Sequence, residues 1–220
     1  MVNALKNKIR PLYATLKKTY FWQMFAFKAR EKALPVYTNN NVEGIKLHIG
    51  SGEINIQGWI NIDARKSDHV HIVTNEIKLT EFNNNSIQEI YLCHVLEHFS
   101  FVEVNELISL FYKKLKQGGV LRLSVPSLDS IIKIYKQNLD DIEAIKYALM
   151  GGQDYEYNFH KSVYNLNHLK KILEKQKFIE VVEWTTKADF GKEIGDWSSS
   201  KFKTKVELVD ISLNMKATKV

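Results

Sequence analysis

Residues 47–63 read LHIGSGEINIQGWINID, and this stretch decides the fold. A short apolar run ends in two closely spaced glycines, Gly50 and Gly52, and a second apolar run ends in Asp63. Short, nearly continuous apolar runs are typical of strands in a parallel sheet. Glycine after such a strand lets the backbone turn tightly and approach a ligand with no side chain in between. The stretch therefore predicts two strands with a ligand-binding turn after the first.

Similar apolar runs recur along the chain and alternate with helical stretches. We predict strands at residues 45–49, 59–62, 70–73, 87–92, 120–125 and 178–184. Apolar residues three and four apart predict helices over 102–115 and 167–176. Residues 206–215 alternate in polarity, and we expect them to be the edge partner of strand 178–184. The prediction is an α/β fold, doubly wound, with a mostly parallel seven-stranded Rossmann-like sheet and an antiparallel C-terminal strand.

The first crossover of this sheet is unusually short. Only the stretch 53–62 lies between Gly52 and Asp63, whereas a dinucleotide-binding fold places its acidic residue about 20 residues on because a helix intervenes. We therefore expect a turn or loop in place of that helix. Without a helix amino terminus to hold a diphosphate, NAD and nucleoside triphosphates are disfavoured, and a cofactor without phosphate is compatible.

The acidic residue at the end of the second strand indicates what the turn binds. In open α/β sheets, ligands bind outside the carboxyl ends of the strands. A carboxylate there accepts hydrogen bonds from ribose hydroxyls, as in dinucleotide sites. The structural alternative is that Gly50 and Gly52 form a plain turn and that Asp63 caps a loop.

Basic residues are concentrated at the amino terminus. Residues 1–34 contain eight lysines and arginines and one acid, a net +7, and the whole chain carries +6, so the remainder sums to −1. We therefore divide the chain into a basic, aromatic-rich helical arm at 1–38 and one domain at 39–220. The aromatic residues at 20–25 either pack on the domain or dock the arm on a membrane surface or a protein partner. The sequence leaves both open.

Cysteine content and hydropathy indicate the compartment. The single cysteine, Cys93, excludes an intrachain disulfide and a metal site of several thiolates, and we predict no metal site. The longest apolar run, 20–27, is far shorter than the roughly 18 to 20 residues that cross a bilayer. We expect a cytoplasmic protein, with peripheral contact to the inner membrane face if the arm docks there.

Three ordered motifs resemble class I S-adenosylmethionine-dependent methyltransferases. They are LHIGSGEINIQGWINID (47–63), NNNSIQEIYLCHVLEHF (83–99) and LKQGGVLRLSVPSLDSI (115–131). More narrowly, they are similar to a bacterial group associated with surface-polysaccharide or lipopolysaccharide assembly. The resemblance continues through GGQDYEYNFHKSVYN (151–165) and covers roughly residues 45–217.

This resemblance implies S-adenosylmethionine as the cofactor. The cofactor-binding residues that it implies are Gly50, Ser51, Gly52, Asp63, Glu76, Cys93 and His94. The glycine turn would approach the methionine part, Asp63 would hold the ribose, and Glu76 would lie near the adenine. Cys93 and His94 would line the methionine end.

A hydroxyl acceptor needs a general base, and histidine suits that role near pH 7. His160, in a loop after the fifth strand, is the first candidate and His94 the second; a surface or core-edge histidine is the structural alternative for His160. Tyr155 and Tyr157 beside it can stack on a sugar or simply pack. We also expect a local role for Glu97 and His98, with Glu97 complementing a helix dipole and His98 bonded to the glycine turn.

The sequence predicts methyl transfer from S-adenosylmethionine to an acceptor, for example a sugar hydroxyl of a surface glycan or its precursor. One alternative is a catalytically inactive methyltransferase-like protein that serves as a binding or scaffold subunit. Another is an RNA-binding or RNA-modifying protein, suggested by the basic arm with its interleaved aromatic residues. Nucleic acid is disfavoured because the rest of the chain sums to −1 and lacks a basic surplus.

Overall fold

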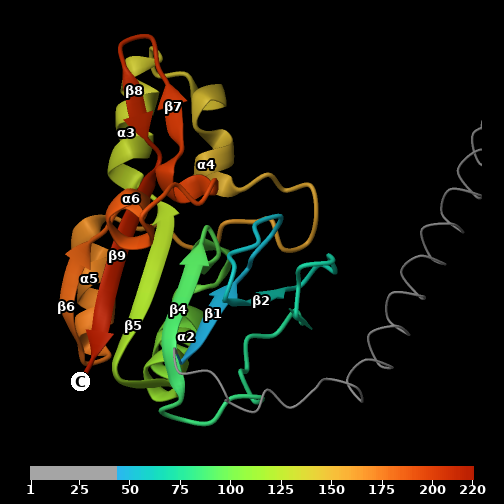
Figure 1. Cartoon of the computed structure of the whole chain (residues 1–220). Helices are drawn as coiled ribbons and strands as arrows, with labels where there is room; N and C mark the ends of the chain where they lie inside the picture. The colour runs from blue at the N-terminus through green and yellow to red at the C-terminus, as the bar shows by residue number, and fades with distance from the viewer. Residues whose placement is uncertain (1–43) are drawn as a thin grey trace, which may run out of the picture. The chain divides into compact units, whose positions relative to one another are not determined.

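A seven-stranded sheet organises the chain in the computed structural model, which describes residues 44–220 (Figure 1). The predicted arm at 1–38 lies outside the described residues. The strand order is β3-β2-β1-β4-β5-β9-β6. The strands are β1 (Ile45–Ile49), β2 (Ile60–Asp63), β3 (Ile72–Val73), β4 (Ile87–Cys93), β5 (Leu115–Pro126), β6 (Phe178–Glu183) and β9 (Ser212–Lys219). Neighbours from β3 to β5 pair in parallel, and β9 is antiparallel to both β5 and β6. The predicted fold class is confirmed.

The C-terminal strand corrects one prediction. It spans Ser212–Lys219 rather than 206–215, and it lies inside the sheet between β5 and β6 rather than at the edge. Leu213, Met215 and Ala217 are buried. Alternation in a sequence shows which residues face the core, but it does not show which strands become neighbours.

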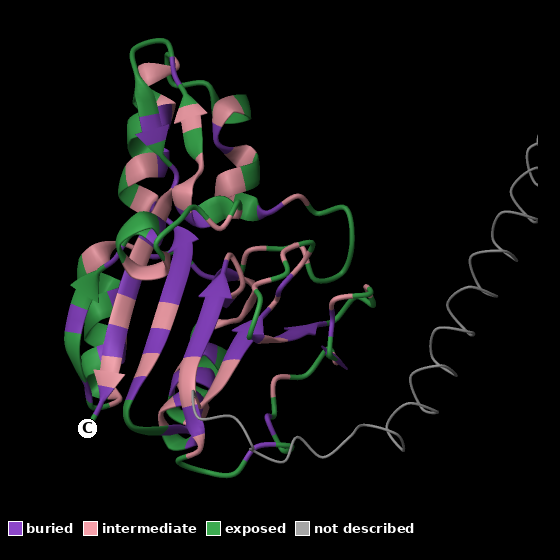
Figure 2. Cartoon of the chain, viewed as in Figure 1, coloured by how far each residue is buried: buried purple, intermediate pink, exposed green. Residues whose placement is uncertain are grey.

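One face of the sheet is covered by α2 (Phe101–Lys114) and α5 (Leu166–Lys175), close to the two predicted helices. The helices and strands together form the main core, and the buried residues are concentrated along the central strands of the sheet (Figure 2). α2 begins at Ser100, whose side chain forms a capping box with Glu103. This box satisfies two backbone donors at the start of the helix and explains why the helix begins there.

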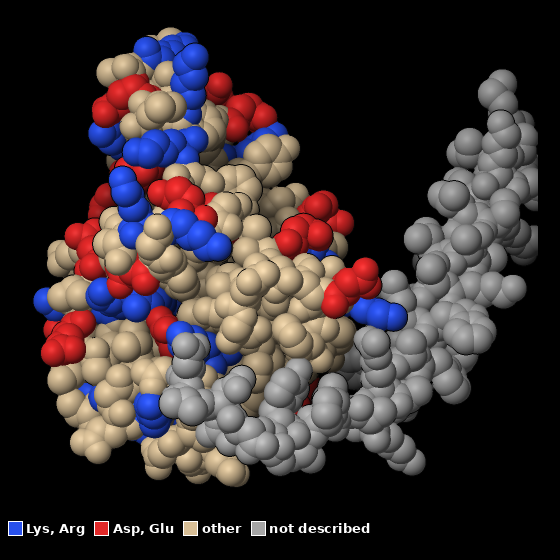
Figure 3. Space-filling model, viewed as in Figure 1, with Lys and Arg blue, Asp and Glu red and all other residues tan. Residues whose placement is uncertain are grey.

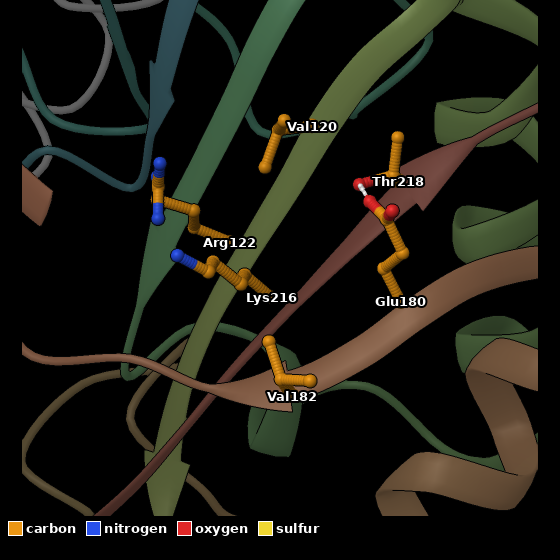
Figure 4. Close-up of a pocket in the computed structure, with 6 residues that line it drawn as sticks. All are labelled: Val120, Arg122, Glu180, Val182, Lys216 and Thr218. Atoms are coloured by element: carbon orange, nitrogen blue, oxygen red, sulfur yellow. Dashed lines mark hydrogen bonds between the residues drawn. The ribbon is translucent and has the colours of Figure 1, made fainter.

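The opposite face carries an aromatic cluster and a short helix, α6 (Thr186–Phe190). The buried cluster consists of Trp59, Tyr91, Cys93 and Trp184. Farther along this face, a hollow is lined by Val120, Arg122, Glu180, Val182, Lys216 and Thr218 (Figure 4). Arg122 and Lys216 each pair with Asp189 at 2.5 Å. Val120 and Arg122 lie in the middle of β5, which ends at Pro126, so the hollow is separate from the carboxyl ends of the strands.

A second, smaller core lies beyond the carboxyl ends of the strands (Figure 1). It is built from α3 (Leu128–Gln137), η2 (Ile142–Ala144), α4 (Lys146–Met150) and the hairpin of β7 (Lys201–Lys203) and β8 (Leu208–Asp210). We call residues 128–150 and 201–210 the cap. The buried apolar residues of this smaller core are Ile131, Ile134, Ile145 and Val209 of the cap, together with Ile211, which directly follows it. The sequence analysis did not predict the cap, and part of the stretch expected to form the last strand belongs to β8.

Between β1 and β2 the chain forms turns and no helix, as predicted. Two 3-10 turns complete the described elements, η1 (Leu96–His98) after β4 and η3 (Trp197–Ser199) before β7. Within residues 44–220, no helix has the length and hydrophobicity to span a membrane.

The cap core can be tested with two adjacent isoleucines of α3. Ile131 is 3% exposed in the cap core, and Ile132 is 51% exposed. We expect Ile131→Ala to lower the free energy of unfolding by about 2–5 kcal/mol, because it removes buried methyl groups and leaves a cavity. Ile132→Ala should change it by less than about 1 kcal/mol. Urea denaturation measures both, and equal losses would contradict the packing described here.

Candidate functional site

The turn after β1 depends on glycine. Gly50 has a φ of +67° and Gly52 a φ of +53°, in the left-handed region. A Cβ on Gly50 would lie 2.2 Å from Cγ2 of Val95, so only glycine lets the turn pack against the residues that follow β4. The Gly50 amide donates to the carbonyl of Ile62 at 2.8 Å, which ties the turn to β2.

Asp63 is fixed beside this turn. Its Oδ2 accepts a hydrogen bond from the Gly52 amide at 2.8 Å, and its Oδ1 accepts one from the Arg65 amide at 2.7 Å. The side chain is almost buried. A carboxylate has about four acceptor positions, so each oxygen can still accept another hydrogen bond. The structure thus brings together the glycine turn and the acidic residue that the sequence singled out.

Buried polar atoms without hydrogen-bond partners gather at the carboxyl ends of the strands. Within residues 44–220 they are Ser51 Oγ, both carboxyl oxygens of Glu97, Ser124 Oγ and Asn214 Oδ1. Ser51 follows β1, Glu97 lies just after β4, and Ser124 is near the end of β5. Buried polar groups are normally satisfied, so a group of exceptions at one edge indicates a place where a ligand or water binds.

The segment 151–161 lies across this edge (Figure 1). The Arg65 guanidinium lies 5.7 Å from the ring centre of Tyr155, and Asn75 Nδ2 donates to the Tyr157 hydroxyl at 3.2 Å. Both tyrosines are 41% exposed. The segment therefore connects the loops after β2 and β3 with the region after β4.

Two predicted cofactor contacts lie elsewhere. The Glu76 side chain is 61% exposed and pairs with Lys78. Cys93 ends β4, and its side chain packs in the aromatic cluster, where burial raises the pKa of its thiol far above the usual range. Neither side chain is brought to the glycine turn, and their predicted contacts remain predictions.

His94 and His160 meet around Glu97. The Nδ1 atom of His94 is 3.5 Å from Glu97 Oε1, and Nε2 of His160 is 3.9 Å from the same oxygen. The backbone explains this arrangement, because the amides of Lys161 and Ser162 donate to the Glu97 carbonyl at 2.8 and 3.2 Å. His98 joins them, with its ring centre 5.0 Å from that of His160. We call His94, Glu97, His98 and His160 the histidine–glutamate cluster.

Burial controls the protonation of this cluster. Burial lowers the pKa of His94 to about 3 and that of His160 to about 4. Burial also raises the pKa of Glu97 to about 8. At pH 7 both imidazoles are therefore neutral and carry a lone pair, but a base with so low a pKa is weak. The proposed base role of His160 or His94 needs help from another group.

The predicted local role of His98 is wrong, whereas Glu97 lies in the first turn of the short helix η1, as expected. The His98 ring contacts the carbonyl of Phe159 at 3.3 Å, and no hydrogen bond joins it to the glycine turn in the described part of the chain. Glu97 is 1% exposed within η1, and the capping of the next helix, α2, falls to Ser100 and Glu103 instead.

His69 and Arg65 also contact the glycine turn and Asp63, although neither was predicted from the sequence. Nε2 of His69 lies 3.0 Å from the Gly52 carbonyl, and Arg65 contacts both Asp63 and Tyr155. Both residues lie in the loop directly after β2, and this position could have identified them as candidates from the sequence.

Charges on the face drawn in Figure 3 are mixed, with lysine and arginine side chains interspersed among acidic ones over the described residues. A continuous basic groove, as expected for nucleic-acid binding, is not seen on that face.

Comparison with solved structures finds methyltransferases at low identity. One is a SAM-dependent methyltransferase from Archaeoglobus fulgidus, 17% identical, covering 94% of this chain and 100% of that chain, with a TM-score of 0.48. Another is a SAM-dependent methyltransferase from Thermotoga maritima, described as a possible histamine N-methyltransferase, 17% identical, covering 88% and 87%, with a TM-score of 0.47. No protein-family model and no curated protein matches the chain.

The glycine turn gives a matched test. Gly50 and Gly58 both have positive φ, but nothing lies within 4 Å of a Cβ on Gly58. We expect Gly58→Ala to cost about 1–2 kcal/mol from backbone conformation alone. Gly50→Ala should cost clearly more, because its methyl group meets Val95. Thermal and urea unfolding measure both, and equal costs would show that Val95 does not confine the turn.

Proposed function

We propose that the chain transfers a methyl group from S-adenosylmethionine to an acceptor bound beside the histidine–glutamate cluster. The observation that carries the proposal is the pairing of the Gly52 amide with Asp63 Oδ2 at 2.8 Å, at the carboxyl ends of two adjacent parallel strands. This is where open α/β sheets bind ligands. The absence of a helix between β1 and β2, a stretch described in full, favours a cofactor without phosphate over a dinucleotide.

The residues present fit an adenosyl cofactor. The remaining acceptor positions of the buried Asp63 suit two ribose hydroxyls, and the unpartnered Ser51 Oγ offers a further polar contact in the turn. S-adenosylmethionine supplies a methyl group on a sulfonium that is its own leaving group, so the protein mainly has to align acceptor, methyl and sulfur.

Packing supports an acceptor near the cluster. Val95 lies against Gly50, and Glu97 follows only two residues later in the chain. The glycine turn and the cluster are therefore neighbours at the same edge of the sheet. Exposed rings of Tyr155, Tyr157 and Trp197 lie on segments that contact this region, and aromatic rings of this kind suit a flat acceptor such as a sugar.

Asp63→Asn tests the cofactor site. We expect it to weaken binding of S-adenosylmethionine by about 1–3 kcal/mol, roughly 5- to 150-fold, because a neutral amide accepts ribose hydrogen bonds less strongly. Asp68→Asn is the matched control, since Asp68 is exposed in the loop after the same strand. Titration calorimetry on folded variants measures both.

Two results would contradict the proposal. Unchanged affinity in Asp63→Asn would remove Asp63 from the cofactor site, and absence of binding to the parent protein would remove the cofactor. Binding without methyl transfer to any sugar, small-molecule or RNA acceptor would favour the inactive binding subunit instead.

A further inference from the structure

Three side chains of the histidine–glutamate cluster have the geometry of a cation site. One ligand atom from each of Glu97, His98 and His160 lies within 4.8 Å of the other two. Glu97 and His98 are consecutive in η1, and His160 is held beside them by the backbone bonds from residues 161 and 162 to Glu97. The three groups are thus brought together by the main chain rather than by flexible side chains alone.

Hydrogen bonds fix the tautomer of both imidazoles. Nδ1 of His160 lies 3.1 Å from the carbonyl of Ala148, and Nδ1 of His98 lies 3.3 Å from that of Phe159. A carbonyl only accepts, so each Nδ1 carries the proton and each Nε2 keeps a lone pair. Metal-binding histidines usually donate their second nitrogen to such a carbonyl, which fixes the tautomer and the ring orientation.

The buried carboxyl group of Glu97 independently indicates a bound cation. It is 1% exposed, and neither of its carboxyl oxygens has a hydrogen-bond partner within residues 44–220. Its recorded ion-pair contacts there are to His94 and His160, not to a lysine or arginine. A buried carboxylate without a compensating charge is costly. A bound cation removes that cost.

His94 is placed to assist. Ser212 Oγ donates to the carbonyl of Trp197 at 2.7 Å and therefore accepts from Nε2 of His94 at 2.8 Å. Nδ1 of His94 then keeps a lone pair, 3.5 Å from Glu97 Oε1. This arrangement also defines the competing explanation, in which a protonated Glu97 simply donates to His94 and no ion binds.

We propose that Glu97, His98 and His160 bind a divalent transition-metal ion. Two imidazoles and one carboxylate suit Zn²⁺, Fe²⁺, Co²⁺ or Mn²⁺, whereas Ca²⁺ and Mg²⁺ prefer oxygen ligands. Metal–ligand bonds of about 2.0–2.2 Å place ligand atoms roughly 3–3.5 Å apart, so side-chain shifts of about 1 Å close the site.

The role of the ion rests on the proposed function. An acceptor bound beside the cluster coordinates the ion through an oxygen, and coordination makes a hydroxyl more acidic. With Nε2 of His160 bound to the ion, His160 no longer serves as the base, and Nδ1 of His94 is the remaining acceptor for the hydroxyl proton. The acceptor of this site is therefore an oxygen nucleophile, a hydroxyl rather than an amine.

The test is titration of chelator-treated, untagged full-length protein with Co²⁺ alone, followed by visible absorption and calorimetry. We expect one ion per chain, a cobalt spectrum characteristic of nitrogen and oxygen ligands, and a higher melting temperature. Glu97→Gln and His98→Gln should each weaken binding at least tenfold, since even residues around a metal's ligands are worth about 10- to 100-fold. His168→Gln is the control, because His168 is exposed on α5.

Circular dichroism of each variant separates loss of the site from loss of the fold. If a variant is unfolded, cobalt binding by the parent protein still tests the proposal. No cobalt binding at millimolar concentration, or binding that survives in both folded variants, overturns it. S-adenosylhomocysteine titration distinguishes the two proposals, because Asp63→Asn should weaken binding of that ligand and leave cobalt binding unchanged. A parent protein that binds cobalt but not S-adenosylhomocysteine would support the metal site and contradict the methyltransferase function.

Discussion

The parallel pairing of β1 with β2 and β4 is the constraint on which the rest of the structure depends. Parallel strands must end at the same edge, so whatever follows each strand is gathered there. Gly50 follows β1, Asp63 ends β2, and His94 follows β4. Residues distant in the sequence thus become neighbours without any direct attraction between them.

Two kinds of contact turn this edge into a site. Local hydrogen bonds fix the proposed cofactor side, where the Gly52 amide donates to Asp63. A long-range connection builds the proposed acceptor side, because the amides of Lys161 and Ser162 donate to the carbonyl of Glu97 and hold the neighbouring His160 there. This arrangement leaves both carboxyl oxygens of Glu97 buried without hydrogen-bond partners. Unsatisfied buried polar atoms are energetically costly, and functional sites are among the places where proteins retain them.

The fold was largely predictable because apolar runs and helical spacing of apolar residues indicate which residues are buried in strands and helices. The turn and Asp63 were predictable for the same reason, since both follow recognisable strands. The place of the C-terminal strand in the sheet was not predictable, because alternating polarity such as that at 206–215 occurs both in edge strands and in internal strands such as β9. The role of Glu97 was also missed, because local patterns do not reveal a partner such as His160, far along the chain. The first helix of the cap was predictable, because Ile131 and Ile134 are spaced as on one face of a helix and follow the capping residue Ser127.

A crystal structure with S-adenosylhomocysteine bound tests the central claim most directly. The account predicts both ribose hydroxyls within about 2.6–3.2 Å of the Asp63 carboxylate, with the sulfur directed toward the histidine–glutamate cluster. A ligand bound in the hollow at Arg122 and Lys216, or one at the strand ends whose ribose makes no contact with Asp63, would contradict it.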